Sequence, residues 1–279
     1  MTRTVLITGC STGFGEATAR LFAAHGWNVV ATMRRPEAGA ALAALGDNVL
    51  VTRLDVQDPA SIDAAVAAAI ARFGRVDVLV NNAGFGLFGV FEAATRDKIQ
   101  EQFDVNVFGV MDVTRALLPH FRANRSGTIV NISSGAGVFT LPMISLYCAS
   151  KFALEGFSEA LSYELASLGI AVKIVEPGGV TKTSFGERSA AEAGTSADLP
   201  DYRPFLEGAM QVFAGLRAAR ADATSEEVAE VIYTAATDGT DQLRYVATED
   251  IKPLVRARRE TSEADYMAFM RERMTPRIG

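Results

Sequence analysis

The sequence predicts a single α/β domain built on a doubly wound parallel sheet between two layers of helices. Short β-branched runs alternate with alanine-rich helical stretches through the first half of the chain. This alternation is typical of βαβ units, which build a parallel sheet. The short runs are also apolar without interruption, as strands buried on both faces are. A glycine-rich turn follows the first run.

The elements are expected in a regular order along the chain. In the first half they are strand 4–8, helix 16–26, strand 28–33, strand 49–56, helix 62–74 and strand 76–84. The second half continues with helix 96–124, strand 127–134, helix 147–168, strand 170–179, helix 225–237, strand 243–247 and two helices in the tail. No linker divides them, so we expect one domain over 1–279.

The pattern loosens between about 181 and 224. Polar and small residues in the first half of this stretch indicate a loop, whereas Phe205, Met210 and Phe213 fall at spacings that fit one apolar helical face. We therefore expect a substrate loop or lid over about 181–224 and a C-terminal extension over about 248–279.

Composition narrows the class of protein. The 33 acidic and 27 basic residues give a net charge of −6 and are mixed along the chain, which argues against a nucleic-acid partner. The chain has two cysteines and two histidines, without the spacing of a disulfide framework or a metal site. We find no run of about 18 apolar residues and no signal peptide before the first strand, so we expect a cytoplasmic protein without a membrane span.

The glycine-rich turn has the sequence TGCSTGFG, with Gly9, Gly13 and Gly15 in the spacing G-x-x-x-G-x-G. A strand-turn-helix of this kind brings the backbone close to a pyrophosphate and directs a helix N-terminus at its charge, as in Rossmann-like sheets. The Gly-Lys-Ser/Thr of a P-loop is absent, which disfavours ATP. An ordinary glycine turn is the alternative.

A second motif, YCASK, places Tyr147 and Lys151 one helical turn apart on the same face. A phenol loses its proton near pH 10, so a tyrosine that exchanges a proton near neutrality needs a positive charge beside it. Alone the pair is weak, because it is expected by chance about once in every two or three chains of this length.

The motifs occur together and in order. With NNAG at 81–84, NVFG at 106–109, NISS at 131–134 and PGG at 177–179, the chain resembles the short-chain dehydrogenase/reductase family across at least residues 4–183. The tail from about 243 also resembles that of the 17β-hydroxysteroid and retinol dehydrogenase branch.

The resemblance implies a catalytic set. Tyr147 would be the general acid in carbonyl reduction and the base in alcohol oxidation. Lys151 would favour loss of the tyrosine proton and hold the nicotinamide ribose. Ser134 would hydrogen-bond the substrate oxygen, where charge develops. Asn106 would bend the long helix and hold a water in the proton relay; a buried asparagine that satisfies backbone groups is an alternative compatible with that role.

The resemblance also implies a set of cofactor contacts. They are Gly9, Ser11, Thr12, Gly13, Phe14, Gly15, Arg34, Arg35, Asp55, Val56, Asn82, Ala83, Gly84, Tyr147, Lys151, Pro177, Gly178, Val180, Thr181 and Thr183. Asp55 would accept from the adenine amino group, with a solvated loop aspartate as the alternative. Lys182 stands where the family usually has threonine, so the contact to the carboxamide would come from a neighbouring threonine or shift.

The end of the second strand predicts NADP(H) rather than NAD(H). An NAD enzyme of this type needs a carboxylate there for the ribose hydroxyls. This chain has Met33 at that place and Arg34 after it, and a guanidinium binds a 2′-phosphate with paired hydrogen bonds. Arg35 and Thr12 would add to the same pocket. A solvated arginine pair is the alternative.

Apolar residues near these motifs predict a pocket for a bulky hydrophobic substrate. They are Phe85, Leu87, Phe88, 138–144, Phe185, Phe205, Met210 and Phe213. Simple core packing is the alternative for any one of them. The expected protein is a ketoreductase, which transfers hydride between NADP(H) and a ketone or secondary alcohol. The other hypothesis, a non-catalytic sensor or scaffold, would be expected to lack the tyrosine, lysine or serine.

The helices at 96–124 and 147–168 predict a homodimer or homotetramer, because their apolar residues occupy more than one side. These residues are Val107, Val110, Met111, Leu117, Leu154, Phe157, Leu161 and Leu165. The family commonly pairs through these two helices.

Overall fold

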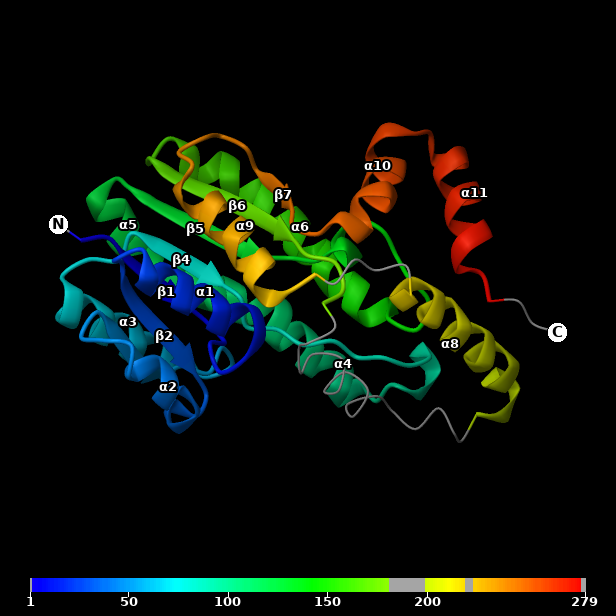
Figure 1. The fold of residues 1–279 in the computed structure, drawn as a ribbon, viewed down its shortest axis with the longest axis horizontal. Coiled ribbons are helices and arrows are strands. Elements are labelled where there is room, and N and C mark those ends of the chain that lie inside the picture. The colour runs from blue at the N-terminus through cyan, green and yellow to red at the C-terminus, as the bar shows by residue number, and fades with distance from the viewer. Residues whose placement is uncertain (1, 181–198, 219–222, 277–279) are drawn as a thin grey trace.

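The computed structural model describes residues 2–180, 199–218 and 223–276. Seven parallel strands form one sheet in the order β3-β2-β1-β4-β5-β6-β7, and helices cover it to make a single α/β domain (Figure 1). The strands are β1 Thr4–Ile7, β2 Asn28–Met33, β3 Val49–Arg53, β4 Val78–Asn81, β5 Gly127–Ile132, β6 Ile170–Glu176 and β7 Arg244–Val246. The predicted fold class is confirmed.

The order of the strands positions a ligand site. Val5 of β1 pairs with Val29 of β2 on one side and with Val78 of β4 on the other. The chain therefore winds outward in both directions from β1 and β4. In sheets of this kind the loops diverge at the carboxyl ends of the two central strands and leave a crevice there.

The two faces of the sheet have separate apolar cores because successive strand side chains point to opposite faces. Val5 and Ile7 of β1 pack with α1 Gly13–Ala24 and α9 Ser225–Thr237. Leu6, between them, packs on the other face. The helices of that face are α3 Pro59–Phe73, α5 Gly109–Asn124 and α6 Ser145–Ala166.

The long helix predicted at 96–124 is interrupted. It consists of α4 Arg96–Phe103, a π-helical turn Asp104–Phe108 and α5. The wider turn contains Asn106, and such turns often lie at functional sites. Gly109 follows it, where an added Cβ would lie 2.7 Å from Cβ of Val56. The helix type thus changes locally at Asn106, and the predicted bend of the helix stays a prediction.

The C-terminal part builds one end of the molecule, where α8, α10 and α11 lie together (Figure 1). Its helices are α8 Arg203–Ala218, α10 Lys252–Glu260 and α11 Glu263–Met274. The two tail helices and the helix through Phe205 and Phe213 were predicted. Val138 and Phe139 pack against α10 and α11, so the extension contacts the loop before α6.

Several short elements were not predicted. They are α2 Ala40–Ala43 and the 3₁₀ turns Pro36–Gly39, Phe91–Ala93, Gly135–Gly137, Pro200–Tyr202 and Glu249–Ile251. Their sequences lack the length over which a helical period is visible. Helix α1 also begins at Gly13, three residues before the predicted Glu16, because the glycine turn itself forms its first turn.

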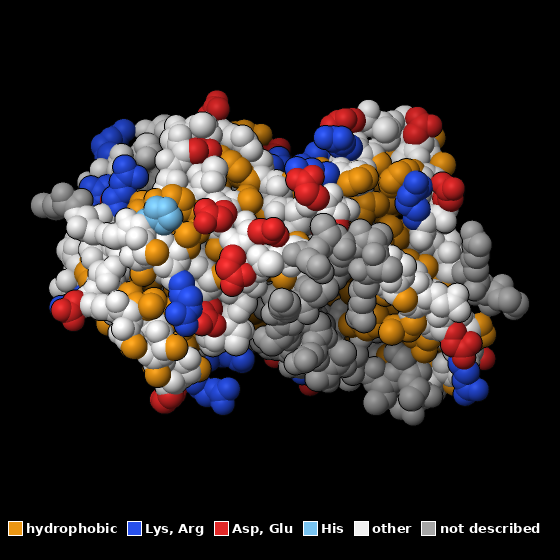
Figure 2. Space-filling model, in the orientation of Figure 1, with side chains coloured by type: hydrophobic (Ala, Val, Ile, Leu, Met, Phe, Trp, Pro, Cys, Tyr) orange, Lys and Arg blue, Asp and Glu red, His pale blue; other side chains and the backbone are white. Residues whose placement is uncertain are grey.

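The surface carries mixed charge. On the face in Figure 2, acidic and basic side chains are interspersed, and apolar side chains gather at the end formed by α8, α10 and α11. Over the part of the chain that the structure describes, we find no helix both long and apolar enough to cross a membrane.

The apolar residues offered as a basis for an oligomer lie mostly inside the protomer. Val107, Val110, Leu117, Leu154, Leu161 and Leu165 are buried. Phe108, Phe152 and Tyr163 are the exposed aromatic side chains of these helices, at 49%, 38% and 73%. Met111 and Phe157 are half-buried, so most of the eight residues do not supply a second apolar face. The oligomeric state stays a prediction.

Candidate active site

A cleft of about 580 Å³ runs along the carboxyl ends of the strands. Most of the predicted site residues line it. They are Gly9, Ser11, Thr12, Gly13, Phe14, Arg34, Asp55, Val56, Asn82, Ala83, Gly84, Ser134, Tyr147, Lys151, Pro177, Gly178 and Val180. Gly15, Arg35 and Asn106 do not line the cleft, and Thr181, Lys182, Thr183 and Phe185 fall outside the described residues.

The glycine turn forms a close-packed cradle at one end of the cleft. Gly9 and Gly13 have φ of +74° and +61°, which L side chains rarely adopt. A Cβ on Gly15 would lie 2.4 Å from the carbonyl oxygen of Gly9. Gly15 is therefore required by the packing of α1 on the turn, and its role as a cofactor contact stays a prediction.

Asn82 braces the same cradle from β4. Its Nδ2 donates to the carbonyl oxygens of Thr8 and Gly9, at 2.8 and 3.1 Å. The turn is thereby fixed with the N-terminus of α1 at the cleft, where an anion is favoured. The cradle leaves no room for a side chain at Gly9 or Gly15, and its backbone and helix N-terminus fit a dinucleotide pyrophosphate.

The ends of β2 and β3 form the next part of the cleft. Met33 is buried and Arg34 is exposed, and both line it. Arg35 does not, because successive side chains of an extended segment point to opposite sides. The carboxylate of Asp55 lines the cleft and accepts from the backbone N–H of Gln57 at 3.1 Å.

Tyr147 lies on the first turn of α6, and its side chain is buried at the middle of the cleft. Burial raises the pKa of its phenol to about 12, and a hydrogen bond with Ser134 opposes the rise. Ser134 is held by its neighbours, since its Oγ accepts from the Ala136 N–H at 3.1 Å. The tyrosine therefore retains a proton that it can donate.

Lys151 follows one turn later and is also buried, with 6% of its surface exposed. Its Nζ donates to the carbonyl oxygen of Ile132 at 2.8 Å and lies 5.8 Å from the ring centroid of Tyr147. Burial lowers the pKa of this ammonium to about 8, and the charge of Glu155 opposes the decrease. The phenol of Tyr147 and the ammonium of Lys151 therefore lie close together, as their four-residue spacing on one helix predicts.

Asn106 lies behind these groups and is fully buried. Its Oδ1 accepts from the Phe85 N–H at 3.1 Å, and its Nδ2 donates to Phe85 O at 2.8 Å and to Ser150 Oγ at 3.1 Å. The side-chain amide of Asn106 thus satisfies the backbone groups of Phe85. This is the structural role expected as an alternative to the proton relay, and it is compatible with it. A role in a proton relay stays a prediction.

Gln102, which sequence reasoning missed, supports the same loop. It is buried, donates to Phe85 O at 2.6 Å and accepts from the Leu87 N–H at 2.8 Å. Its position four residues before Asn106 places the two amides one turn apart on consecutive helical turns. This four-residue spacing is the sequence feature that could have identified Gln102.

The other end of the cleft is apolar. Leu87, Phe88, Phe139, Leu141, Ile144, Met210 and Phe213 line it, as predicted. Phe85 packs in the core instead, and Phe205 packs beside Tyr202. Leu216, Asp250, Ile251 and Leu254 also line the cleft and were missed. Leu216 continues the apolar face of α8 three residues after Phe213, which was a readable signal.

Fold and site together define a dinucleotide-binding oxidoreductase. Residues 3–193 match the short chain dehydrogenase family, and the chain belongs to that family. Human 17-beta-hydroxysteroid dehydrogenase type 1 is 38% identical to it over 288 residues, which cover 97% of this chain and 85% of the human protein. The predicted resemblance to that branch is confirmed.

Solved structures agree with this assignment. A short-chain dehydrogenase from Streptomyces avermitilis is 36% identical, with a TM-score of 0.82, and the match covers 97% of this chain and 95% of that one. A short-chain dehydrogenase/reductase from Burkholderia phymatum, in complex with NAD, is 28% identical, with a TM-score of 0.79 and 93% coverage of both chains. Structural neighbours hold NAD or NADP.

Proposed function

We propose that the protein transfers hydride between NADP(H) and a ketone or secondary alcohol on a bulky hydrophobic substrate. One observation carries the proposal. The side chains of Tyr147, Ser134 and Lys151 lie in one cleft, between a glycine cradle and an apolar end. This arrangement supports a reaction in which a proton donor and a dinucleotide site act beside space for a hydrophobic skeleton.

The residues have separate tasks in carbonyl reduction. The bound cofactor supplies the hydride that forms the new C–H bond. As the C=O π bond breaks, the substrate oxygen takes the proton of Tyr147. Ser134 donates a hydrogen bond to that oxygen as its charge grows, and Lys151 stabilises the phenolate that remains. Oxidation of an alcohol follows the same steps in reverse.

The proposed preference for NADP(H) rests on Arg34, which lines the cleft where a carboxylate would select NAD. We expect Arg34→Ala to weaken NADPH binding about ten- to a hundredfold, since charge-assisted hydrogen bonds contribute about 1.5–3 kcal/mol. NADH binding should change little. Arg35→Ala is the matched control, because Arg35 has the same charge but does not line the cleft.

Met33→Asp should favour NADH, because the new carboxylate would accept from the ribose hydroxyls and repel a 2′-phosphate. Calorimetric titration of the four proteins with both cofactors measures these affinities. Equal affinity of the wild-type protein for NADPH and NADH would contradict the preference, as would an Arg34→Ala variant that loses both alike.

The substrate class is tested with a panel of ketones by the absorbance of the reduced nicotinamide. We expect bulky apolar ketones to be reduced and small hydrophilic ones to react slowly, because the end of the cleft beyond Tyr147 is lined by residues such as Phe88, Leu141 and Phe213. No consumption with any ketone, together with tight cofactor binding, would instead support the sensor hypothesis.

A further inference from the structure

A network of charged side chains connects α6, the helix that carries Tyr147 and Lys151, to the neighbouring elements. Glu155 is on α6, one turn after Lys151, and is 6% exposed. Its Oε2 accepts from Nε of Arg244 at 3.0 Å. Burial raises the pKa of this carboxyl, while Arg244 opposes the rise. An ionic group is rarely buried so deeply unless it is paired.

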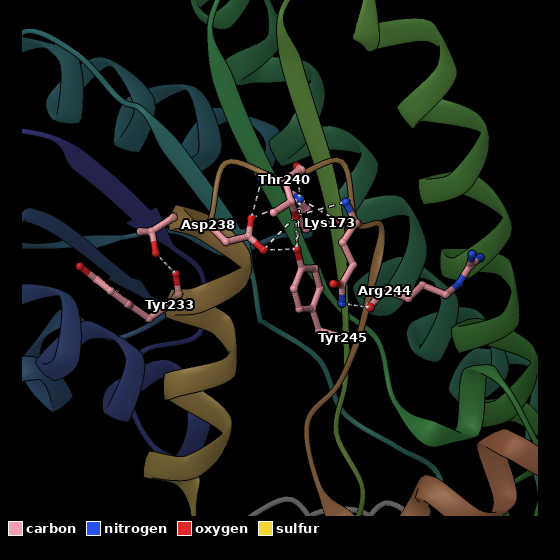
Figure 3. Close-up of polar contacts among 8 residues, drawn as sticks. Lys173, Tyr233, Asp238, Thr240, Arg244 and Tyr245 are labelled. Atoms are coloured by element: carbon pink, nitrogen blue, oxygen red, sulfur yellow. Dashed lines mark hydrogen bonds and ion pairs between the residues drawn. The ribbon is translucent and has the colours of Figure 1, made fainter.

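Arg244 joins three carboxylates. From β7 its side chain extends toward α6 (Figure 3), where it also contacts Glu159 at 2.5 Å, and its Nε lies 3.7 Å from Oε1 of Glu176. Glu176 ends β6 and is fully buried. Both terminal nitrogens of Arg259, on α10, donate to its carboxylate. One network of ion pairs therefore connects α6, the sheet at β6 and β7, and α10 of the C-terminal extension.

The network carries an excess negative charge. Its three carboxylates, Glu155, Glu159 and Glu176, face two guanidinium groups, Arg244 and Arg259. Glu155 is the member nearest to Lys151 along α6, one helical turn away. Lys151 is the basic residue of α6, and its ammonium is therefore the buried positive charge closest along this helix to the excess.

The other elements around Lys151 contribute mostly neutral groups among the described residues. Tyr147 and Cys148 come from α6, Asn106 from the π-helical turn, and Ser133, Ser134 and the Ile132 carbonyl from the end of β5. Glu176, Arg244 and Arg259 approach from β6, β7 and α10 as parts of the network. Asp104, in the π-helical turn, accepts a hydrogen bond from Gln100 on its own helix face.

We propose that Glu155 is a positioning residue for the reaction, and that its buried carboxylate keeps the ammonium of Lys151 protonated at the working pH. This role rests on the proposed function, in which Lys151 acts as a cation beside Tyr147. A neutral lysine would neither stabilise the phenolate nor attract the ribose oxygens as strongly. The apolar burial that brings Lys151 to the cleft favours the neutral form, so an opposing charge is required.

Glu155→Gln tests the role with almost no change of shape. A neighbouring charge in a buried but partly screened site shifts a pKa by about half a unit to one unit. The alkaline limb of kcat/KM for ketone reduction, at saturating NADPH, should therefore move to lower pH by about that amount. At pH 6, where Lys151 stays protonated in both proteins, the two rates should agree within about threefold.

Glu159→Gln is the matched control. It removes the same charge from the same arginine, but the Glu159 side chain is 42% exposed and lies one turn farther from Lys151. Its alkaline limb should not move. Arg259→Gln removes a positive charge and should move the limb in the opposite direction, which damage to the fold cannot imitate. This variant also keeps the proposal testable if Glu155→Gln does not fold.

A second readout needs neither cofactor nor activity. The free energy of unfolding of the apoprotein is compared with that of Lys151→Met from pH 6 to pH 10.5. The difference between the two should begin to change near pH 8, where folded Lys151 loses its proton before the unfolded lysine does. In a Glu155→Gln background the change should begin about half a unit to one unit lower.

The outcomes separate the two proposals. If no ketone is reduced but the unfolding curves shift as described, the proposed function fails and the charge coupling stands. If the wild-type protein is active and both Glu155→Gln curves coincide with those of Glu159→Gln, the role of Glu155 is overturned.

Discussion

Among the residues that the structure describes, two lysines are deeply buried, and they have opposite surroundings. Lys173, on β6, is 2% exposed and donates to the carbonyl oxygens of Thr240 and Gln242 at 2.6 and 2.8 Å and to the hydroxyl of Tyr245 at 3.1 Å (Figure 3). Asp238 lies 3.6 Å away. Lys151, 6% exposed, donates to one carbonyl oxygen at 2.8 Å and faces the cleft.

The difference shows that burial of a lysine does not by itself tell whether the side chain stabilises the fold or takes part in the reaction. An ammonium has three donors. For Lys173 the protein accepts all three, and the lysine thereby holds the loop between α9 and β7 against β6. Lys151 is buried without such a cage among the described residues, where one donor is hydrogen-bonded to the Ile132 carbonyl, and under the proposed function the others serve a bound ligand. We infer that Lys173 stabilises the fold and that Lys151 costs stability to serve catalysis.

Replacing the two lysines by methionine should give opposite results, and the largest effect is on turnover. We expect Lys151→Met to lower kcat/KM by about 10³-fold, because both a cation in the transition state and a cofactor contact are lost. Lys173→Met should leave kcat/KM per folded molecule within about twofold of wild type. Steady-state rates with NADPH and a reduced ketone measure both. A comparable loss of kcat/KM in both variants would contradict the assignment of different roles to the two lysines.

The next effect is on stability. Lys173→Met should lower the free energy of unfolding by about 2–4 kcal/mol, because two carbonyl oxygens and Asp238 lose a buried partner. Denaturant titration at pH 7 checks this. Lys98→Met is the control, since Lys98 lies on the exposed side of α4 and forms a surface ion pair with Glu101. A change below about 0.5 kcal/mol for Lys173→Met would mean that the cage contributes little.

Lys151→Met should raise the free energy of unfolding at pH 7 by about 1–2 kcal/mol, because the folded state no longer buries a charge. The pKa of Lys151 decreases from 10.5 to about 8 on folding. The unfolded chain therefore binds more protons than the folded one between these values, and the wild-type protein gains stability as pH rises through this window. The advantage of the variant should shrink from pH 8 to pH 10.5. A constant difference would contradict the assigned burial.

The smallest effect concerns the apolar end of the cleft. Met210 lines it and remains 48% exposed. Met210→Ser should raise KM for a bulky ketone about three- to tenfold, from loss of roughly 1 kcal/mol of apolar contact, with kcat little changed. Gln211→Ser, on the same helix but not lining the cleft, is the control. Equal KM in the two variants would remove Met210 from the pocket.

Many of the residues that line the cleft could be predicted from the sequence, for a physical reason. Gly9, Asn82, Ser134 and Tyr147 act through positions fixed by strand ends and helical turns, so short motifs predict their places. Lys173 gave no such signal. Its partners come from the turn after α9 and from β7, some 70 residues away, and only the folded sheet brings them together.

The less successful predictions share the same limit. Helical spacing shows that Val110 and Leu161 are apolar, but not that the sheet and neighbouring helices of the same protomer cover them. Arg35 was paired with Arg34 by adjacency, whereas an extended backbone separates their side chains. Ile251 and Leu254 reach the cleft from the C-terminal extension, and their placement depends on how that extension packs.

The proton of Tyr147 is the centre of this account, and Tyr147→Phe tests it most directly. The ring still packs beside Ser134 and Lys151, so the affinity for NADPH should stay within about threefold of wild type, as measured by calorimetry. The transferable proton is gone, and kcat for ketone reduction should fall by about 10²-fold or more. A Tyr147→Phe variant that kept more than about a tenth of wild-type turnover would contradict the assignment of Tyr147 as the proton donor.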